Sequence, residues 1–428
     1  MNNKTDTMKN DSTRTLTPKL RFPEFRNDPE WTEVPLEQIA DRATTKNHDG
    51  SIARVLTNSA EHGVVDQRDY FDKDIAKAGN TGGYYIVDLD DFVYNPRTSS
   101  LAPVGPISKN DLGKGVMSPL YTVFRFKDEN TDFYQCYFKS ASWHSYLRRV
   151  SSMGARHDRM NISSGDFMAM PVPRPQAKEQ QKISDCLNSL DELITVEDRK
   201  LKALRNHKRG LMQQLFPQPG QSQPRLRFPE FRDKGEWERL PFARVIKIAS
   251  GQVDPTKSPY CNWAHIGGEN IQSHTGIIEN IKTAKELQLI SGKYVFDEKD
   301  VLYSKIRPAL NKIATPNFKG LCSADIYPIR PSSRKLRRDF LGYLLLSDTF
   351  LEHAIMHSDR GKIPKINRET LLAFKSSLPS PSEQKKIVNV FKAIDSQITT
   401  QTENIKTLKQ HKRGLLQQLF PTPEESEA

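Results

Sequence analysis

The stretch EQQKISDCLNSLDELITVEDRKLKALRNHKRGLMQQLF, residues 179–216, decides the architecture because it returns as EQKKIVNVFKAIDSQITTQTENIKTLKQHKRGLLQQLF at residues 383–420, with a constant offset of 204. In each copy, apolar residues recur at alternating spacings of four and three, the heptad pattern of a helix that pairs with another helix. The predicted helix-pairing seam consists of Ile183, Leu187, Leu190, Ile194, Leu201, Leu204, Leu211 and Leu215 in the first copy, and of Ile387, Phe391, Ile394, Ile398, Ile405, Leu408, Leu415 and Leu419 in the second.

The two copies also share their polar interruptions, Glu197 and Lys208 in the first and Gln401 and Lys412 in the second. Polar seam residues cost stability but fix register and orientation. Each seam covers about 32 residues, or roughly 48 Å of helix, and is too narrow to cover a globular core, so a second long helix is expected alongside it. We predict that the two helices of one chain pack antiparallel; a coiled coil between two copies of the protein is the alternative.

A second repeated segment lies before each helix-forming region, and about 140 residues separate the two. PKLRFPEFRNDPEWTEVPL, residues 18–36, returns as PRLRFPEFRDKGEWERLPF at residues 224–242. Its prolines predict an irregular packing segment rather than a regular helix or a central strand. Its aromatic residues are expected to form local core: Phe22, Phe25 and Trp31 in the first copy, and Phe228, Phe231 and Trp237 in the second.

Residues 37–175 and 243–380 lie between these repeats and differ strongly from one another, although traces of common descent survive. GYYIVDLDDFVYNPR (83–97) aligns with GKYVFDEKDVLYSKIR (292–307), which matches Tyr85 with Tyr294, Asp91 with Asp300 and Tyr94 with Tyr303. Each of these stretches predicts a strand, an acidic turn and a second strand that runs into a basic loop. FYQCYFKSASWHSYLRR and FLGYLLLSDTFLEHAI, further on, each predict an amphipathic helix. We therefore predict two mixed α/β domains of about 140 residues each.

The charge is unevenly distributed. The chain carries a formal charge of +12, yet residues 37–175 hold 17 basic and 17 acidic residues, whereas residues 243–380 hold 21 and 13. A basic protein without membrane features most often binds nucleic acid. The N-terminus is polar, and no apolar run reaches the length of a membrane span, so a cytoplasmic protein is expected. Four scattered cysteines without a CxxC pair are expected to be buried thiols rather than metal ligands or disulfides.

The LRFPEFR…EW segments, the EQ(Q/K)KI helix starts and the HKRGL(M/L)QQLFP helix ends resemble those of the specificity subunit of type I restriction-modification systems. The resemblance covers nearly the whole chain. It implies two target recognition domains, two long antiparallel spacer helices, and conserved regions that dock two modification (methyltransferase) subunits. It further implies that the chain reads an asymmetric, bipartite sequence in double-stranded DNA on behalf of subunits that methylate adenine, and of restriction subunits that translocate and cleave DNA. S-adenosylmethionine, ATP and Mg are then expected on the partner subunits, with no cofactor or metal on this chain.

The expected fold class is α+β: two mixed α/β target recognition domains separated by two long antiparallel coiled-coil helices, in a pseudo-two-fold internal repeat. The expected organisation is a disordered tail (1–17), the proximal repeat (18–36), target recognition domain 1 (37–175), a central spacer helix (176–216), a linker with the second repeat (217–242), target recognition domain 2 (243–380), a C-terminal spacer helix (381–420) and an acidic tail (421–428).

The chain lacks the motifs of the enzymes it would serve. The nearest approach to an adenine methyltransferase loop, Asn95-Pro96-Arg97, lacks the second proline and the aromatic residue, and there is no GxxxxGK[ST] phosphate loop. Asp297-Glu298-Lys299 has the D-x-K spacing of a nuclease but is interpreted as a charged hairpin turn. His207 and His411 recur at one helix position, where helix packing or a subunit contact is expected. A non-catalytic DNA-binding subunit is thus predicted; a peptide-binding structural adaptor and a self-sufficient methyltransferase or nuclease are the alternatives.

DNA contacts are expected from basic residues in loops, because Arg and Lys contact both base edges and phosphates. Arg97 and Arg307 lie in matching loops, and the glycine-bearing loops SSMGARHDR and SDRGKIPK precede each domain exit. The predicted DNA-contacting residues are Arg97, Arg156 and Arg159 in the first domain, and Lys305, Arg307, Lys312, Lys362, Lys365 and Arg368 in the second.

Overall fold

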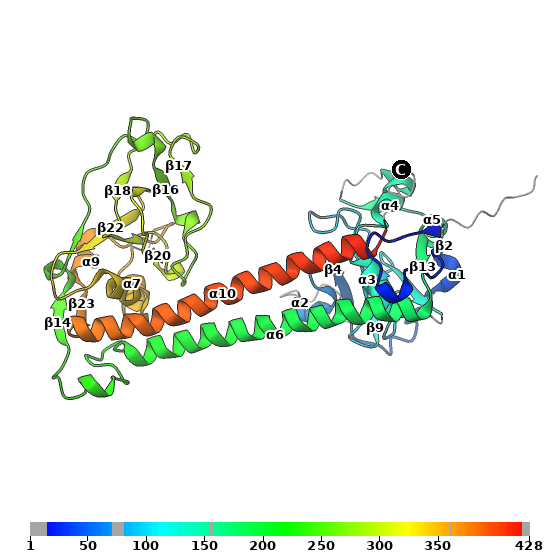
Figure 1. Ribbon diagram of the computed structural model, residues 1–428, viewed down its shortest axis with the longest axis horizontal. Helices are drawn as coiled ribbons and strands as arrows, with labels where there is room; N and C mark the ends of the chain where they lie inside the picture. The colour runs from blue at the N-terminus through cyan, green and yellow to red at the C-terminus, as the bar shows by residue number, and fades with distance from the viewer. Residues whose placement is uncertain (1–14, 71–80, 128, 154–157, 360, 422–428) are drawn as a thin grey trace, which may run out of the picture. The chain divides into compact units, whose positions relative to one another are not determined.

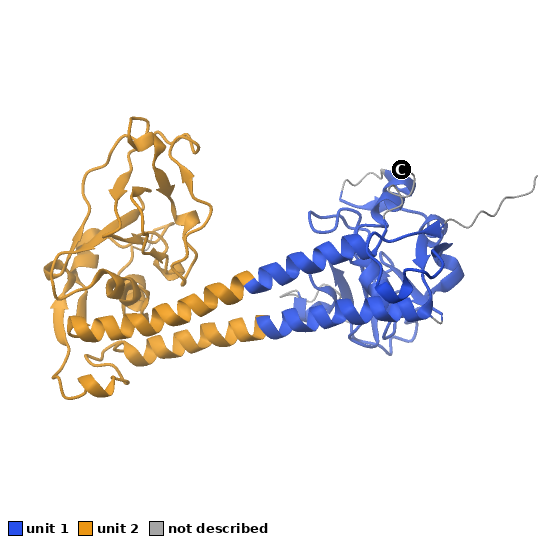
Figure 2. Ribbon diagram, viewed as in Figure 1, with its two compact units in different colours: residues 1–197, 404–428 blue, residues 198–403 orange. Residues whose placement is uncertain are grey.

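The computed structural model describes residues 15–70, 81–127, 129–153, 158–359 and 361–421 (Figure 1). These residues form two compact units (Figure 2). Unit 1 contains residues 1–197 and 404–428, and unit 2 contains residues 198–403. Each unit is described by itself below.

Two long helices pass through both units. Helix α6 spans Ala177–Leu215 and helix α10 spans Pro381–Leu419, with 39 residues in each. Both lie within the predicted ranges, and the only proline, Pro381, is at the first position of α10, where it removes no hydrogen bond. Helix α6 begins in unit 1 and ends in unit 2, whereas α10 begins in unit 2 and ends in unit 1 (Figures 1 and 2).

The two helices run antiparallel within each unit. In unit 1, Ile183 and Leu187 near the start of α6 share a core with Leu419 at the end of α10, and further along Lys412 pairs with Asp191. In unit 2, Phe216 just after α6 stacks on Phe391 of α10, with ring centroids 6.0 Å apart. All sixteen predicted seam residues are buried or half-buried.

Two of the polar seam interruptions are explained by ion pairs. Lys412 binds Asp191 in unit 1, and Lys208 binds Asp395 in unit 2 with 2.6 Å between Nζ and Oδ1. The two pairs are related by the sequence repeat, since each residue of one pair lies 204 positions from its counterpart in the other. Each lysine is therefore satisfied by an aspartate of the other helix, and a shift in register would separate the charges.

Unit 1 is built on a four-stranded antiparallel sheet in the order β3-β10-β7-β8. Helix α3 packs on this sheet, where Tyr134 stacks on Phe126 at 4.3 Å between ring centroids. The strands are β1 Thr15–Leu16, β2 Trp31–Pro35, β3 Ala40–Arg42, β4 Leu56–Ser59, β5 Gly63–Asp66, β6 Tyr85–Val87, β7 Phe92–Tyr94, β8 Ile107–Lys109, β9 Gly115–Met117, β10 Thr122–Phe126, β11 Ser152–Met153, β12 Met160–Asn161 and β13 Pro171–Arg174. The shorter helices are α1 Leu36–Ile39, α2 Gln67–Tyr70, α3 Thr131–Phe138, α4 His144–Val150 and α5 Ser164–Met168.

Unit 2 has the equivalent antiparallel sheet, β15-β22-β19-β20, and a second sheet, β17-β16-β21-β18, in which β16 and β21 are parallel. Helix α8 packs on the first sheet through Phe350, whose ring lies 5.3 Å from that of Tyr303. The strands are β14 Glu238–Pro241, β15 Ile246–Ile248, β16 Ala264–Ile266, β17 Lys282–Thr283, β18 Tyr294–Phe296, β19 Val301–Ser304, β20 Ile313–Ala314, β21 Gly320–Cys322, β22 Ile326–Pro331 and β23 Lys375–Leu378. The shorter helices are α7 Arg338–Leu346, α8 Asp348–Met356 and α9 Arg368–Ala373.

The repeated segment before each domain binds the first turn of a long helix. Arg21 donates two hydrogen bonds of 2.8 Å to Glu179 in the first turn of α6, and Arg227 donates bonds of 2.8 and 2.9 Å to Glu383 in the first turn of α10. Both glutamate side chains are 1% exposed. The positive end of the helix dipole favours a carboxylate at this position. The LRF and EQ motifs thus recur because they form the same buried ion pair twice.

The prediction of an irregular segment over residues 18–36 was wrong in part. Strand β2 lies at the centre of the sheet β1-β2-β13, because Pro29 precedes it and Pro35 ends it, so the amides of Thr32, Glu33 and Val34 can take part in the sheet. The second copy forms strand β14, which pairs with β23.

The predicted disordered tail is also too long. Thr15 and Leu16 form strand β1, and Leu16 is 3% exposed in the core of unit 1, because an apolar residue beside β2 gains from burial. Residues 1–14 of that tail and residues 422–428 of the acidic tail lie outside the described residues.

Each predicted amphipathic helix is divided in two. Helix α3 ends before α4 begins at His144, and α7 ends at Leu346, where Ser347 starts α8 by accepting a hydrogen bond from the backbone N–H of Phe350. The predicted hairpin turn at Asp297 is a turn between two sheets, since β18 pairs with β21 and β19 pairs with β22. Asp297 there binds Arg330 at 2.8 Å.

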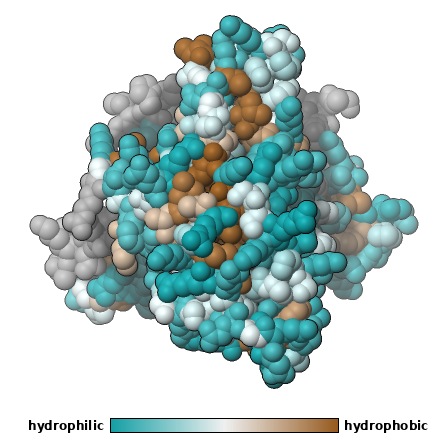
Figure 3. Space-filling model, turned by 90° about the vertical axis from the view of Figure 1, so that its left-hand side faces the viewer, coloured by the Kyte–Doolittle hydropathy of each residue, from teal (hydrophilic) through white to brown (hydrophobic). Residues whose placement is uncertain are grey.

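The face of unit 2 in Figure 3 is mostly hydrophilic, with hydrophobic side chains in a few small groups. None of the helices in the described ranges is long and apolar enough to span a membrane.

Candidate functional site

The basic loops predicted from the two aligned stretches are positioned by equivalent ion pairs. In unit 1, Asp91 accepts hydrogen bonds from Arg125 (2.6 and 2.8 Å), and in unit 2 Asp300 accepts them from Arg330 (2.8 and 2.7 Å). Hydrogen bonds to Asp91 and then Asp88 raise the pKa of Arg125, so the pair stays charged. These pairs fix the turn before β7 and β19, the strands that lead into the basic loops.

In unit 1 the structure brings Arg97 and Arg159 together. The two residues form an isolated antiparallel bridge, supported by a hydrogen bond of 2.9 Å from the N–H of Met160 to the carbonyl of Pro96. Arg97 is exposed and Arg159 is half-buried. Arg156 lies outside the described residues. The two predicted basic segments of unit 1 therefore form one surface, although 62 positions separate Arg97 from Arg159 in the sequence.

Unit 2 repeats this arrangement. Ile306 and Lys365 form an isolated antiparallel bridge, the N–H of Arg307 donates to the carbonyl of Pro364 at 2.7 Å, and the N–H of Ile366 donates to the carbonyl of Lys305 at 2.9 Å. Arg307, Lys362 and Lys365 are exposed. A cationic surface made of two loops thus occurs at the same place in both units.

Three predicted residues of unit 2 are engaged within the unit. Arg368 donates to the carbonyls of Ile248 (3.0 Å) and Ala249 (2.8 Å) and lies over the ring of Tyr327. Lys312 donates to the carbonyl of Gly268. Lys305 lies 3.6 Å from Asp325 and also contacts the ring of Tyr327. These side chains brace the surface, which leaves Arg307, Lys362 and Lys365 as the exposed cations among the predicted residues of unit 2.

The sequence analysis missed the groups that brace these loops. Tyr327 packs against both Lys305 and Arg368, and Arg125 and Arg330 anchor the preceding turns. Arg125 and Arg330 occupy matching positions, each the second-to-last residue of its strand (β10 and β22), so a full alignment of the two domains would have found them.

Among the described residues, no cluster of three His, Cys, Asp or Glu side chains could hold a metal ion. The four cysteines are free; Cys136 and Cys322 are buried, whereas Cys186 and Cys261 are only half-buried, so the prediction of four buried thiols was wrong for two of them. Burial raises the pKa of Cys136 to about 11, which disfavours the reactive thiolate. His207 and His411 are exposed, which excludes the predicted helix packing and leaves the subunit contact as a prediction.

Residues 235–410 match the family described as "Type I restriction modification DNA specificity domain". The chain is 29% identical over 269 residues to the specificity subunit of the type I restriction enzyme EcoDI from Escherichia coli, a match that covers 56% of this chain and 59% of that subunit. It is 24% identical over 326 residues to the specificity subunit of the type I restriction enzyme MjaVIII from Methanocaldococcus jannaschii, which covers 72% of this chain and 74% of that subunit.

Two solved structures have a similar fold. One is a chain from a study of the structural basis underlying complex assembly and conformational transition of the type I R-M system, with a TM-score of 0.58 and 17% identity over 91% of this chain and 97% of that chain. The other is the type I restriction-modification system S subunit from M. genitalium, with a TM-score of 0.54 and 13% identity over 95% and 99% of the two chains.

The mixed α/β fold with long helices and the family match define residues 235–410 as a type I restriction-modification DNA specificity domain. The resemblance of this chain to the specificity subunits of type I restriction-modification systems, predicted from its two repeated segments, is confirmed.

Proposed function

We propose that this chain is the DNA sequence-specificity subunit of a type I restriction-modification complex, without catalytic activity of its own. Residues 37–175 and 243–380 are the target recognition domains, and each reads one half of an asymmetric, bipartite target in double-stranded DNA. The observation that supports this proposal is the bridge between two basic loops that recurs in both units: Arg97 pairs with Arg159 in unit 1, and Ile306, next to Arg307, pairs with Lys365 in unit 2.

The long helices are proposed to set the unread spacer between the half-sites. A helix of 39 residues is about 58 Å long, and antiparallel pairing along its whole length would hold two recognition surfaces at a fixed separation. The repeated segments are proposed to dock two modification subunits that methylate adenine and, in the complete complex, restriction subunits that translocate and cleave DNA. S-adenosylmethionine, ATP and Mg would bind to those partners, and the complex would act in the cytoplasm.

The test is DNA binding by the chain co-expressed with its modification subunits. A duplex with the bipartite sequence, identified by mapping methylated adenines in the host genome, should outcompete random DNA at moderate salt. Affinity should also fall steeply with salt, because each neutralised phosphate releases counterions. A peptide-binding adaptor would show neither effect, and turnover by the purified chain alone would contradict a non-catalytic role.

The variants Arg97→Ala and Arg307→Ala assign each surface to a half-site. Each should weaken binding of the cognate duplex by about 5-fold to 150-fold, the range for one lost arginine contact to DNA. The loss should depend on the bases of one half-site only. Lys335→Ala is a matched control, because Lys335 is a surface cation of unit 2 that is paired with Glu238 away from the basic loops. Wild-type binding after both arginine substitutions would contradict the assignment.

A further inference from the structure

A β-hairpin stands beside the basic surface in each unit. In unit 1, strands β4 and β5 enclose the turn Ala60-Glu61-His62, and Gly63 follows with φ +67°. In unit 2, Ile271 and Ile278 form an isolated bridge that encloses His274, and Gly276 has φ +79°. Both turns therefore carry a histidine one or two positions before a glycine in the left-handed region, although the surrounding sequences differ.

The hairpin of unit 1 is bonded to both ends of the loop that carries Arg97. The amide of Asn58 at the end of β4 donates to the carbonyl of Pro106 at 3.1 Å, and the amide of Asn95 donates to the carbonyl of Asn58 at 2.8 Å. The turn then passes over β8, since a Cβ on Gly63 would lie 3.6 Å from Ser108. The hairpin and the basic loop are thus parts of one rigid surface.

The hairpin of unit 2 is fixed to the equivalent strand. The N–H of His274 donates to the carbonyl of Asn311 at 3.1 Å, Lys312 donates to the carbonyl of Gly268, and a Cβ on Gly276 would lie 3.3 Å from the carbonyl of Ile313. Asn311, Lys312 and Ile313 follow the loop of Arg307. Both hairpins therefore occupy the same place relative to the basic loops.

The backbone of this surface in unit 2 is held in an unfavourable conformation. His274 (φ +63°), Arg307 (φ +47°) and Asn311 (φ +44°) are all non-glycine residues in the left-handed region. Such residues are uncommon and gather at binding sites, where the surrounding structure imposes the conformation. All three lie on the hairpin or on the basic loop beside it, whereas the other two such residues described in unit 2, Asn280 and Gln288, lie outside this surface.

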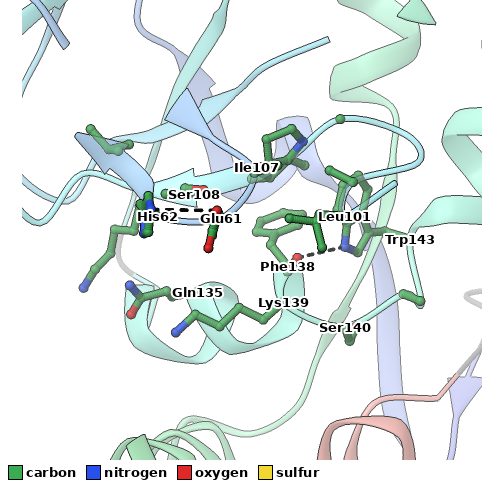
Figure 4. A pocket seen from close by; sticks show the side chains of 18 of the residues that line it. Glu61, His62, Leu101, Ile107, Ser108, Gln135, Phe138, Lys139, Ser140 and Trp143 are labelled. Atoms are coloured by element: carbon green, nitrogen blue, oxygen red, sulfur yellow. Dashed lines mark hydrogen bonds and ion pairs between the residues drawn. The ribbon is translucent and has the colours of Figure 1, made fainter. Parts of the chain in front are cut away.

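The histidine side chains are accessible. His62 is 56% exposed and lies 3.9 Å from Glu61. It lines an open pocket of about 560 Å³, together with Leu101 of the basic loop, Ser108 of β8 and Lys139 after α3 (Figure 4). His274 is also exposed, and its imidazole makes no hydrogen bond to the described residues. An imidazole can donate to or accept from a base edge, and a carboxylate such as Glu61 can accept from the amino group of cytosine.

We propose that the two hairpin turns, Ala60–Gly63 and Ser273–Gly276, are a third DNA-contacting segment in each recognition domain, and that His62 and His274 contact bases there. This inference rests on the proposed function. In unit 1 the histidine has an acidic neighbour, Glu61, which suits the turn to base edges rather than to phosphates, because a carboxylate is repelled by a phosphate. In unit 2, His274 lies between Ser273 and Thr275, which are uncharged. The basic loops then supply most of the affinity, and the hairpins supply part of the sequence preference.

The experiment compares His62→Ala, His274→Gly and the control His48→Ala in the full-length chain with its modification subunits. Glycine is chosen at position 274 because it removes the side chain and takes φ +63° without strain. His48 is an exposed histidine of unit 1 outside the hairpin. Binding is measured to the wild-type bipartite duplex and to duplexes in which each half-site base is replaced in turn, and folding is checked by circular dichroism.

Each hairpin variant should lose about tenfold in preference at one or two positions of a single half-site, the half-site assigned to the same unit by Arg97→Ala or Arg307→Ala. His48→Ala should match the wild type. The inference is overturned if both hairpin variants keep the wild-type preference within twofold at every position, or if they weaken all duplexes equally. His62→Gln repeats the measurement if His62→Ala does not fold. Failure of the wild-type chain to prefer any bipartite duplex would instead refute the proposed function.

Discussion

Unit 1 and unit 2 share the ion pairs that stabilise their folds, but they differ in the charge of the surfaces that those folds carry. The ion pairs Arg21–Glu179 and Arg227–Glu383 have nearly equal hydrogen-bond lengths. The ion pair Asp91–Arg125 of unit 1 likewise has a counterpart in unit 2, Asp300–Arg330. In contrast, the domain of unit 1 is balanced in charge, whereas that of unit 2 is strongly basic. The comparison indicates that one set of stabilising ion pairs can support domains with very different loops. Three smaller differences between the units allow this interpretation to be tested.

The largest effect is expected from the buried glutamates at the starts of the long helices. Glu383→Ala should lower the free energy of unfolding of unit 2 by about 3 kcal/mol, because the half-buried Arg227 loses its carboxylate partner. Glu179→Ala should have a smaller effect on unit 1. Glu383 also accepts a hydrogen bond of 3.3 Å from Trp237, whereas the indole N–H of Trp31 is buried without a partner among the described residues.

Hydrogen exchange of peptides from each unit, measured in increasing urea, separates the two effects. Glu24→Ala removes an exposed carboxylate that pairs with Lys182 at 3.0 Å, and it serves as the control with no measurable change expected. Equal losses for Glu179→Ala and Glu383→Ala would show that the Trp237 bond contributes nothing.

A smaller effect is expected from the aspartates that pair across the two helices. Asp395→Ala should cost unit 2 about 1–2 kcal/mol, because Asp395 accepts bonds from both Lys208 (2.6 Å) and the hydroxyl of Tyr343 (2.7 Å). Burial, followed by the charge of Asp395, raises the pKa of Tyr343, so this hydroxyl keeps its proton and donates. Asp191→Ala should cost unit 1 only about 0–1 kcal/mol, since Asp191 pairs with exposed or half-buried lysines alone and has no counterpart of the Tyr343 bond.

Urea denaturation of the four proteins wild type, Asp191→Ala, Asp395→Ala and Tyr343→Phe tests this ranking. Tyr343→Phe should account for part of the Asp395→Ala loss. The proposed difference between the units is contradicted if Asp191→Ala is the more destabilising of the two aspartate variants.

The third effect is the part of the pH dependence of unit 1 that comes from His144. Burial, and then Arg148, lowers the pKa of His144 from 6.5 to about 4 in the folded state. The unfolded chain binds the proton more readily, so the stabilising contribution of neutral His144 is complete above pH 6.5 and is lost as the pH falls from about 6.5 towards 4. His144→Gln should therefore flatten the stability of unit 1 over this range, as measured by hydrogen exchange, and should leave unit 2 unchanged. An unaltered slope in unit 1 would contradict the assignment to His144.

The long helices and their seam could be predicted because a heptad pattern lies within one continuous stretch of sequence. The pairing of Lys208 with Asp395 could not be predicted, because Lys208 lies in the seam and Asp395 does not. Strand β2 was missed because its prolines stand at its ends, and composition alone does not show which amides they leave free.

The basic loops could be predicted from the alignment of residues 83–97 with 292–307, which also placed Arg97 and Arg307 in corresponding loops. Arg368 was assigned to the surface on its charge alone, and nothing in the sequence indicates that the carbonyls of Ile248 and Ala249 occupy its guanidinium. The hairpins were missed because the two domains differ in length there, so their histidines do not align by a constant offset.

The crossing of each long helix from one unit to the other has a consequence for biosynthesis. The core of unit 2 is completed by Phe216, which is made before the rest of that core, so unit 2 can close as soon as its own residues have left the ribosome. The core of unit 1 is completed by Leu419 and Phe420, and the hydroxyl of Ser142 bonds to the carbonyl of Phe420 at 3.2 Å. The unit that is translated first is thus the unit that finishes folding last, and a premature stop codon at or before position 419 would remove Leu419 and Phe420 from the core of unit 1.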